Sequence, residues 1–214
     1  MSITYPIKLP GLDLPNVGVQ VPISSIRFKP RSVVALSASP FTLQQQIQAH
    51  QGQIWMVDIK LKQLKGASAQ EWIAALLSLN GIQGTFYLGD PALRAPRGTH
   101  PGTPVVDGAS QTGQMLNTEG WTITQTGILL AGDWIQLGTG LTQRIYRILK
   151  DINSDGNGKA SLDIWPRLRE SPANHDSVII HNTMGIFRMS DNEMPWDIEY
   201  SLLYGFEFSV IEAI

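Results

Sequence analysis

WMVDIKLKQLKGASAQEWIAALLSLNGIQGTFYLG, residues 55–89, contains two strand patterns separated by one helical pattern. Residues 55–62 alternate apolar and polar side chains, which is typical of a half-buried strand with a charged outer face. Residues 68–79 carry apolar side chains at helical spacing, and Ser68 and Glu71 have the spacing of a capping box. A lone amphipathic helix between strands predicts a sheet with one helix packed across it.

Further strand patterns lie on both sides of this stretch. Residues 41–49 alternate in the same way, and residues 50–53 are predicted as a hairpin turn before the next strand. The tail alternates again over residues 204–211. Between them, short strands spaced near ten residues with glycine in the turns predict a small barrel or sandwich. We expect these short strands at residues 122–130, 133–137, 144–149 and 160–165.

These patterns predict a mainly β protein: a β-sandwich with one packed α-helix, plus a smaller inserted β-barrel or sandwich domain. We expect residues 1–88 and 176–214 to form the first domain and residues 114–175 to form the insert. Residues 89–113 are rich in Gly, Pro, Ser and Thr. They are predicted as a linker, because a loop of this length is uncommon inside a compact domain.

Composition excludes several classes of function. Charged residues make up 16% of the 214 residues and the formal net charge is −2, whereas typical soluble domains have about 25% charged residues. A lightly charged surface favours contact with other proteins, and the lack of a basic excess argues against specific nucleic-acid binding. The chain holds no cysteine, which excludes disulfides, a thiol nucleophile and a thiolate metal site.

No membrane segment or secretory signal is expected. No apolar run approaches the ~18 residues of a membrane helix. Residues 1–15 lack the basic and apolar regions of a signal peptide. The protein is therefore expected to be made in a cytosol, without membrane insertion.

Charge is unevenly distributed along the chain. Residues 1–66 hold seven basic and two acidic side chains, a net charge of +5. Residues 189–214 hold six acidic side chains and no basic one, a net charge of −6. The two ends are expected to attract each other, either within one sheet system or between neighbouring subunits. The shared sheet system is the preferred interpretation.

The sharpest local motif is DINSDGNG, which begins at Asp151 and matches the opening of a calcium-binding loop. The position of the closing bidentate carboxylate holds Leu162, and the flanking segments have strand patterns. Asp, Asn and Gly are also the residues that favour a hairpin turn. A turn is therefore the preferred interpretation, with calcium binding by Asp151, Asn153 and Asp155 as the alternative.

Signatures of catalytic and cofactor sites are missing from the sequence. The histidines lack metal-ligand spacing, and no nucleophile elbow, P-loop or dinucleotide fingerprint occurs. We therefore predict no enzyme, and we assign no catalytic, cofactor-binding or metal-binding residue and no cofactor. The four histidines are His50, His100, His175 and His181.

Aromatic residues of the insert leave a second class of function open. Trp121 and Tyr146 suggest stacking on sugar rings, which would make the insert a carbohydrate-binding module. Trp134 and Trp165 lie within predicted strands among aliphatic residues, so they are expected in the core.

Six segments carry a further signal when they are taken together. They are WIAALLSLNGIQGTFYLGDP (72–91), GDWIQLG (132–138), RIY (144–146), DGNGKASLDIWPRLR (155–169), GIFR (185–188) and FEFSVIEA (206–213). These segments resemble the tail proteins of long-tailed bacteriophages, and the most similar type is the distal tail protein, the ring that joins the tail tube to the tail tip. The resemblance extends over about residues 40–214, and its motifs are short and structural.

The resemblance implies an N-terminal β-sandwich with a helix, forming a six-fold ring, and a peripheral β-domain, without catalytic residues. We therefore expect a structural virion protein of the phage tail, made in the host bacterial cytoplasm. Its expected partners are other copies of itself in a hexameric ring, the tail tube protein and the tail-tip hub, with the tape-measure protein as a further candidate. A host-surface carbohydrate-binding module of the baseplate is the alternative, and an envelope or glycan hydrolase is the third hypothesis.

Overall fold

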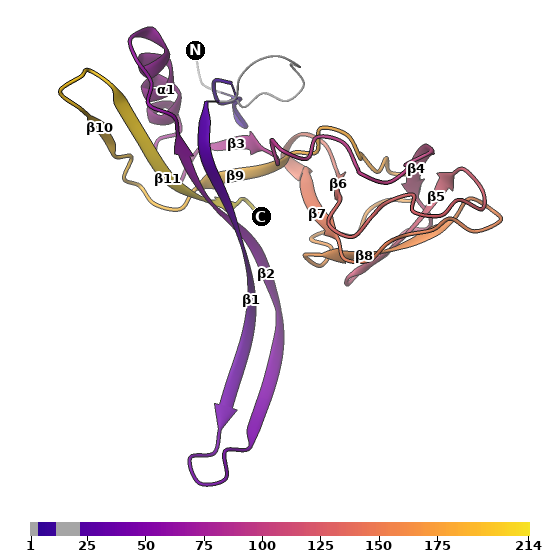
Figure 1. Cartoon of the computed structure of the whole chain (residues 1–214). Coiled ribbons are helices and arrows are strands. Elements are labelled where there is room, and N and C mark those ends of the chain that lie inside the picture. The colour runs from indigo at the N-terminus through magenta and orange to yellow at the C-terminus, as the bar shows by residue number, and fades with distance from the viewer. Residues whose placement is uncertain (1–3, 12–21) are drawn as a thin grey trace.

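The computed structural model of the chain describes residues 4–11 and 22–214. The described residues form two antiparallel sheets and one α-helix, which confirms the predicted mainly β fold class (Figure 1). The first sheet contains β1 (Ile23–Ala38), β2 (Gln45–Leu61), β3 (Thr85–Leu88), β9 (Gly185–Met189), β10 (Trp196–Ile198) and β11 (Tyr204–Glu212). The second contains β4 (Gly102–Val106), β5 (Met115–Trp121), β6 (Trp134–Leu137), β7 (Arg144–Ile148) and β8 (Ala160–Trp165).

The first sheet has the strand order β1-β2-β11-β9-β3. β10 pairs with the first residues of β11, from Tyr204 to Phe206. The strand predicted over residues 55–62 is the inner half of β2, whose Val57 and Ile59 are fully buried. Phe208 of β11 lies opposite Ile59, and the alternation predicted for residues 204–211 is confirmed. Both strands therefore direct one apolar face into a shared core.

The predicted helix is α1 (Ala67–Ser78), which lies on the core face of this sheet. Trp72 and Leu76 are buried there, and the ring of Trp72 lies 6.4 Å from the ring of Phe208. The helix thus supplies the second layer that closes the first core.

The capping box predicted at Ser68 and Glu71 is wrong. The helix begins at Ala67 and its N-cap is Gly66, which adopts a φ of 58° and has no side chain to accept a bond from the first helical N–H groups. Ser68 is therefore already inside the first helical turn, where it cannot act as the N-cap residue. The glycine conformation, rather than a side-chain oxygen, sets the direction in which the chain enters the helix.

The basic N-terminal part and the acidic C-terminal part share the first sheet, as predicted. Lys60 Nζ on β2 lies 3.1 Å from Glu207 Oε2 on β11. On the same outer face, Asp58 accepts hydrogen bonds of 2.6 Å from Lys29 Nζ and from Ser209 Oγ. These two bonds, that from Lys29 first, lower the pKa of the Asp58 carboxyl below its ordinary value. Asp13, which belongs to the N-terminal charge count, lies outside the described residues.

β1 and β2 form one long hairpin. Their register ends with Ala38 opposite Gln45, so the turn lies at residues 39–44. The turn predicted at residues 50–53 is therefore wrong, and Phe41 belongs to the hairpin turn instead of to a half-buried strand. β2 continues without interruption because β1 pairs with it on both sides of residues 50–53.

The polar residues 50–52 lie in an irregular part of β2. The register shifts there, since Ser32 pairs with Gln53 but Val34 pairs with Ala49. A side chain at Gly52 would place its Cβ 2.8 Å from Cγ2 of Val33, so glycine lets the two strands approach. The glycine that suggested a turn belongs to a bulge-like irregularity within a strand.

The second sheet has the order β4-β5-β8-β7-β6 and curls into a half-barrel around its own core. The strands predicted near β6, β7 and β8 are present, but the strand predicted at residues 122–130 is not. Thr124 and Gly127 have φ values of 52° and 62°, far from those of extended backbone, and Leu129 pairs only in an isolated bridge with Ile152. The strand in this part of the chain is β5, which ends at Trp121, just before the predicted segment begins.

The segment 89–113 is more than a linker, because β4 lies within it and forms an edge of the second sheet. On the side of β4 away from β5, the Pro104 carbonyl accepts a 3.0 Å bond from the Val178 N–H, so residues 175–178 extend this edge of the sheet. Val178 and Ile180, which we placed with the first domain, pack in the second core. The chain therefore returns to the first sheet only at β9.

An aromatic cluster joins the two sheets. The ring of Trp134 lies 5.4 Å from that of Phe28 and 5.0 Å from that of Trp55. The ring of Trp165 lies 4.3 Å from that of Trp55, edge to face. Trp134 is buried in the first core although its strand belongs to the second sheet. The two sheets are thus connected by packed aromatic rings as well as by the chain.

Candidate functional site

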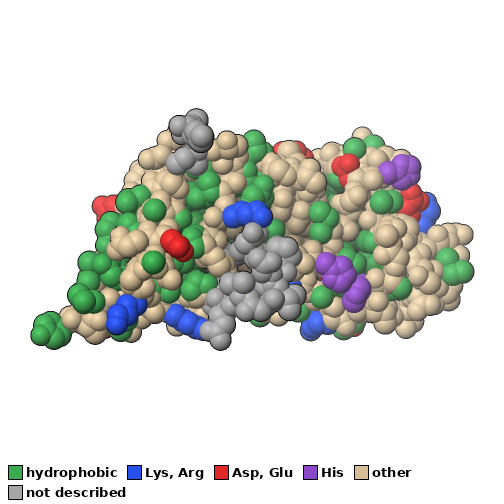
Figure 2. Space-filling model, turned by 90° about the horizontal axis from the view of Figure 1, so that it is seen from above, with side chains coloured by type: hydrophobic (Ala, Val, Ile, Leu, Met, Phe, Trp, Pro, Cys, Tyr) green, Lys and Arg blue, Asp and Glu red, His purple; other side chains and the backbone are tan. Residues whose placement is uncertain are grey.

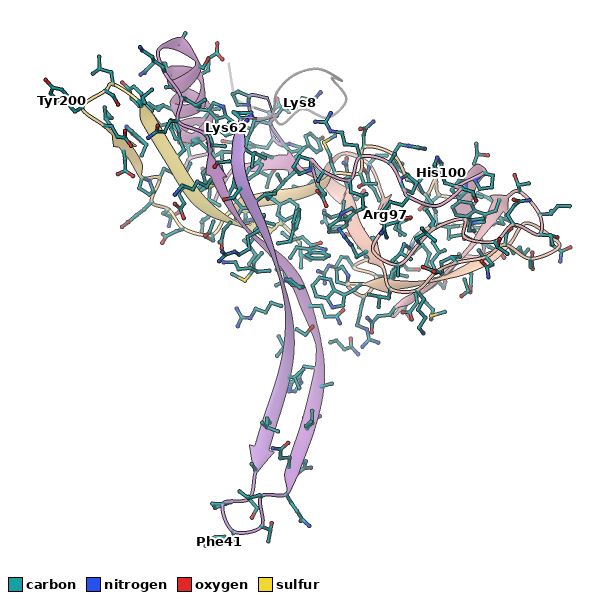
Figure 3. The ribbon with its side chains drawn as sticks, in the orientation of Figure 1. Lys8, Phe41, Lys62, Arg97, His100 and Tyr200 are labelled. Carbon is teal, nitrogen blue, oxygen red and sulfur yellow. The ribbon has the colours of Figure 1, made fainter. Side chains whose placement is uncertain are left out.

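The outer half of the β1–β2 hairpin projects from the body of the molecule (Figure 1). We call residues 32–52 the arm, and Phe41 lies at its free end (Figure 3). Every residue of the arm except Ser39 is exposed. β11 pairs with β2 only from Met56 inward, so among the described strands the arm is paired only with itself.

The arm contains no Asp, Glu, Lys or Arg, and the uncharged run extends to residue 57. Such a segment is unusual on a surface, because exposed edge strands are generally protected by charged residues. The arm was not predicted, since the alternation at residues 41–49 is typical of a half-buried strand. The length of the uncharged run together with its glutamines is the signal that identifies this segment.

The arm has one apolar face and one polar face. Residues that lie directly opposite each other in an antiparallel pair share a face. Leu36 lies opposite Ile47, with Val34 on the same face, whereas Ser37 lies opposite Gln46 on the other face. The apolar face of the arm is therefore continuous along both strands.

This apolar face continues the core face of the body. Ile26 and Phe28 of β1 pack against the first core, and Val34 and Leu36 follow at even positions of the same strand. Even positions of a strand share one face. In the body this face is covered by side chains of α1 and of the second sheet, whereas in the arm it is exposed to solvent.

The exposed side chains represent a large amount of unburied apolar surface. Leu36 is 61% exposed, Ile47 is 66% exposed and Phe41 is 95% exposed. Complete burial of such a side chain stabilises a structure by about 1.5–3 kcal/mol. A two-stranded hairpin alone is marginal in water, and contiguous exposed apolar surface marks contact sites. The arm is therefore suited to insertion against another protein surface.

The root of the arm is fixed in position. The backbone N–H of Arg167, just after β8, donates a 2.7 Å hydrogen bond to Gln53 Oε1. Nearby, the Arg169 guanidinium forms a buried ion pair of 2.5 Å with Glu212 at the end of β11. These contacts and the aromatic cluster orient the arm relative to the second sheet.

The two aromatic residues predicted for sugar stacking are both buried. Trp121 is 4% exposed and its Nε1 donates to Thr118 Oγ1 at 2.9 Å. Tyr146 is 2% exposed, its hydroxyl accepts a bond from the Arg169 N–H, and burial raises the pKa of that hydroxyl. Neither ring offers a face to a ligand, so the observation that motivated the carbohydrate hypothesis is lost.

The candidate calcium residues do not converge on one point. Asp151 Oδ1 accepts a bond from Ala131 N at 2.8 Å, and Asn153 Oδ1 accepts one from Gly127 N at 2.8 Å. Asp155 Oδ1 accepts bonds of 2.8 Å from the N–H groups of Lys159 and Asn157, which lower the pKa of its carboxyl. Asp151 and Asn153 thus satisfy backbone groups of the connection between β5 and β6, and Asp155 satisfies those of its own turn between β7 and β8. Leu162, at the position of the missing closing ligand, is buried.

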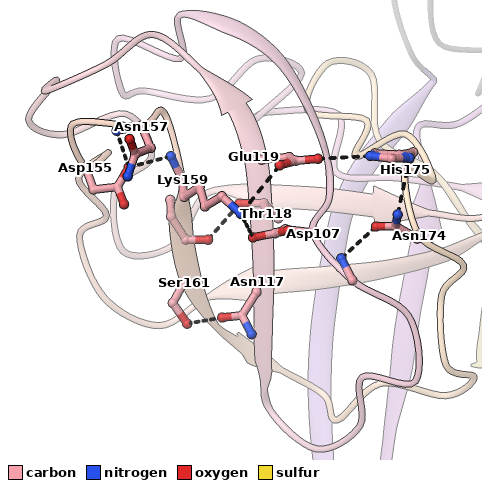
Figure 4. Close-up of polar contacts among 12 residues, drawn as sticks. Asp107, Asn117, Thr118, Glu119, Asp155, Asn157, Lys159, Ser161, Asn174 and His175 are labelled. Carbon is pink, nitrogen blue, oxygen red and sulfur yellow. Dashed lines mark hydrogen bonds and ion pairs between the residues drawn. The ribbon is translucent and has the colours of Figure 1, made fainter.

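A polar hollow of about 510 Å³ lies beside this connection. Figure 4 shows the polar contacts among residues in and beside this hollow. Lys159 Nζ lies 2.7 Å from Asp107 and 3.7 Å from Glu119, and the bond to Asp107 raises the pKa of the ammonium. His175 Nε2 lies 3.1 Å from Glu119. Ser161 completes the set by donating to Asn117 across the same face. Lys159 thus serves two carboxylates, whereas the Asp155 carboxylate is held by backbone N–H groups.

The remaining histidines do not form a metal centre. The rings of His100 and His181 meet edge to face with centroids 4.9 Å apart, whereas His50 lies on the arm. Among residues 4–11 and 22–214, no group of three or more His, Cys, Asp or Glu side chains is arranged to hold a metal ion.

Comparisons with protein-family models and with curated proteins give no match to this chain. In the described part of the chain, no helix has the length and apolar character needed to cross a membrane. The geometry of the arm is therefore the main evidence on function.

Proposed function

We propose that this chain is a structural virion protein that forms a hexameric ring at the distal end of a phage tail and has no enzymatic activity. In this role it joins the tail tube to the tail-tip hub. Its partners are other copies of itself, the tail tube protein and the hub, with the tape-measure protein as a further candidate.

The arm is the observation that carries this proposal. Its apolar face, with Leu36 and Ile47, lies outside the body of its own chain and is left for a neighbour to cover. If each copy gives its arm to the next copy, the contact is head-to-tail, and head-to-tail contacts close into rings when the rotation allows it. The resemblance of the six sequence segments to distal tail proteins supports the same assignment.

The second sheet fits the role of a peripheral domain. It is held to the first sheet by the aromatic cluster and by the ion pair between Arg169 and Glu212, and it lies beside the body, away from the tip of the arm (Figure 1). In a ring built from the first sheet and its arm, the second sheet would remain available for contact with other tail proteins.

The molar mass of the purified chain in solution, measured by light scattering after size exclusion, tests the proposal. We expect wild-type protein to form a closed oligomer, with a six-membered ring visible by electron microscopy. Leu36→Asp combined with Ile47→Asp is expected to give monomers, because two carboxylates would be buried without partners. Ser37→Asp with Gln46→Asp, on the polar face, is the matched control and is expected to assemble. A wild-type protein that remains monomeric at high concentration would contradict the proposal.

A further inference from the structure

The first sheet has two free edges that carry opposite charge. β1 pairs only with β2 and forms one edge of the sheet. β10 pairs only with the first residues of β11 and forms the other edge. Arg27 and Arg31 lie on the β1 edge. Glu193 precedes β10, and Asp197 is its central residue. A basic edge and an acidic edge thus lie at opposite sides of one sheet.

None of these four side chains has a direct partner among the described residues. Arg27 and Arg31 are exposed, and their side chains form no hydrogen bond or ion pair with any described residue. The positive charge of Arg27 only adds, after Lys29 and Ser209, to the lowering of the pKa of the Asp58 carboxyl. Glu193 and Asp197 are also exposed, and within the same described part of the chain neither has an ion-pair partner. By contrast, Lys29, on the same edge, is paired with Asp58. The four unpaired charges are free to bind an oppositely charged surface.

The two edges also match face by face. Arg27 lies opposite Asp58 on the outer face of the sheet, and Asp197 lies opposite Gly205, which belongs to that same face of β11. Trp196 lies opposite Phe206, whose side chain is buried in the core, so Trp196 belongs to the core face. If β1 of one copy continued the sheet at β10 of another, arginines would meet carboxylates on one face.

On the core face, the same arrangement brings apolar side chains together. Ile198 is 57% exposed, Tyr200 is fully exposed, and both lie in the β10–β11 hairpin. Hydrophobic side chains gather at this end of the molecule, the left end in Figure 2. The half-buried Ile26 and Phe28 of β1 are the matching apolar residues on the other edge.

We infer that the basic β1 edge of one copy docks against the acidic β10 edge of the next copy, and that this contact sets the head-to-tail order of the ring. The inference rests on the proposed function and names the surfaces that meet. Arginine–carboxylate pairs are strong and directional. Two like edges repel each other, so the charge pattern also disfavours a two-fold dimer in which β1 meets β1 or β10 meets β10.

Charge reversal on each edge tests this contact. Arg27→Glu with Arg31→Glu makes the β1 edge acidic, and Glu193→Lys with Asp197→Lys makes the β10 edge basic. In each variant both edges carry the same sign, so each is expected to lose the oligomer that the wild type forms. An equimolar mixture of the two variants is expected to regain it, because each edge then finds an opposite charge on the other variant in an alternating ring.

Light scattering gives the readout, and circular dichroism confirms that each variant is folded. Glu170→Lys is the matched control, because Glu170 is an exposed acid beyond β8 without an ion-pair partner among the described residues, and it is expected to assemble. Variants that assemble as the wild type does, or a mixture that does not regain the oligomer, would overturn the inference and leave the proposed ring in place. A monomeric wild type would overturn the proposed function itself.

Discussion

Replacing Arg169 by leucine is expected to destabilise the protein strongly. The Arg169 guanidinium contacts both carboxylate oxygens of Glu212, with Nη2 at 2.5 Å and Nε at 3.4 Å. The Arg169 side chain is 9% exposed and that of Glu212 is 1% exposed. The Glu212 carboxylate also accepts a 3.3 Å bond from the N–H of Trp55. Without Arg169, this single N–H would be left to compensate a buried negative charge.

The expected cost follows from the burial of the pair. Removing one partner of a buried ion pair costs about 3–5 kcal/mol, because the other charge remains buried and uncompensated. For a chain of this length each kcal/mol lowers the melting temperature by about 2–4 °C, so Arg169→Leu is expected to lower it by about 6–20 °C. Replacing both residues by leucine is expected to cost much less than Arg169→Leu alone, because no unpaired charge is then left in the interior.

Urea and thermal unfolding followed by circular dichroism measure these differences. The exposed pair Lys60–Glu207, with side chains 58% and 69% exposed, is the matched control. Lys60→Leu is expected to change the free energy of unfolding by less than about 1 kcal/mol. If Arg169→Leu were as mild as Lys60→Leu, or if the double substitution were as costly as the single one, the reasoning on the buried pair would be refuted.

Three further predictions concern single side chains. The hydrogen bonds to Asp58 lower the pKa of its carboxyl, so the stability they supply is present above about pH 4 and is lost as pH falls through the folded-state pKa. The wild type should therefore lose more unfolding free energy than Asp58→Asn on acidification, and equal losses would contradict this. Millimolar calcium should leave the melting temperature unchanged, whereas a rise of several degrees that Asp155→Ala abolishes would show that the turn binds metal. Trp134→Ala should cost about 3–5 kcal/mol in urea unfolding, and a change near zero would refute its role in joining the sheets.

The elements that could be predicted from the sequence are those whose periodicity is set by one buried face. The inner half of β2, the helix α1 and β11 each place alternate or helically spaced apolar residues in the first core, and each was predicted. For such elements the local pattern and the tertiary contacts require the same conformation.

The arm could not be predicted in this way, because its extended conformation depends on the pairing of its two strands and not on a buried face. Residues 50–53 have the composition of a turn, and only the pairing with β1 keeps them extended. The strand β1 itself was not predicted, so nothing indicated that Phe41 lies at the tip of a hairpin. Strand conformation depends more on pairing than on local preference.

The assignment of buried aromatic residues to a core also required the structure. Trp134 and Trp165 were expected inside the insert, whereas they pack against Trp55 of the first sheet. Trp121 was considered for ligand stacking, whereas it is buried in the second core. Sequence periodicity shows that a side chain is buried on one face of a strand, but not which neighbouring sheet covers that face.

The location of this chain in assembled particles is the most direct test of the proposed function. Antibodies raised against the purified chain, applied to the phage particles that contain it and viewed by electron microscopy, give that location. We predict label at the end of the tail far from the head, and none on the head or along the tail tube. Label along the whole tube, or particles without label that still carry complete tails, would contradict the proposal that this chain forms the ring at the tail tip.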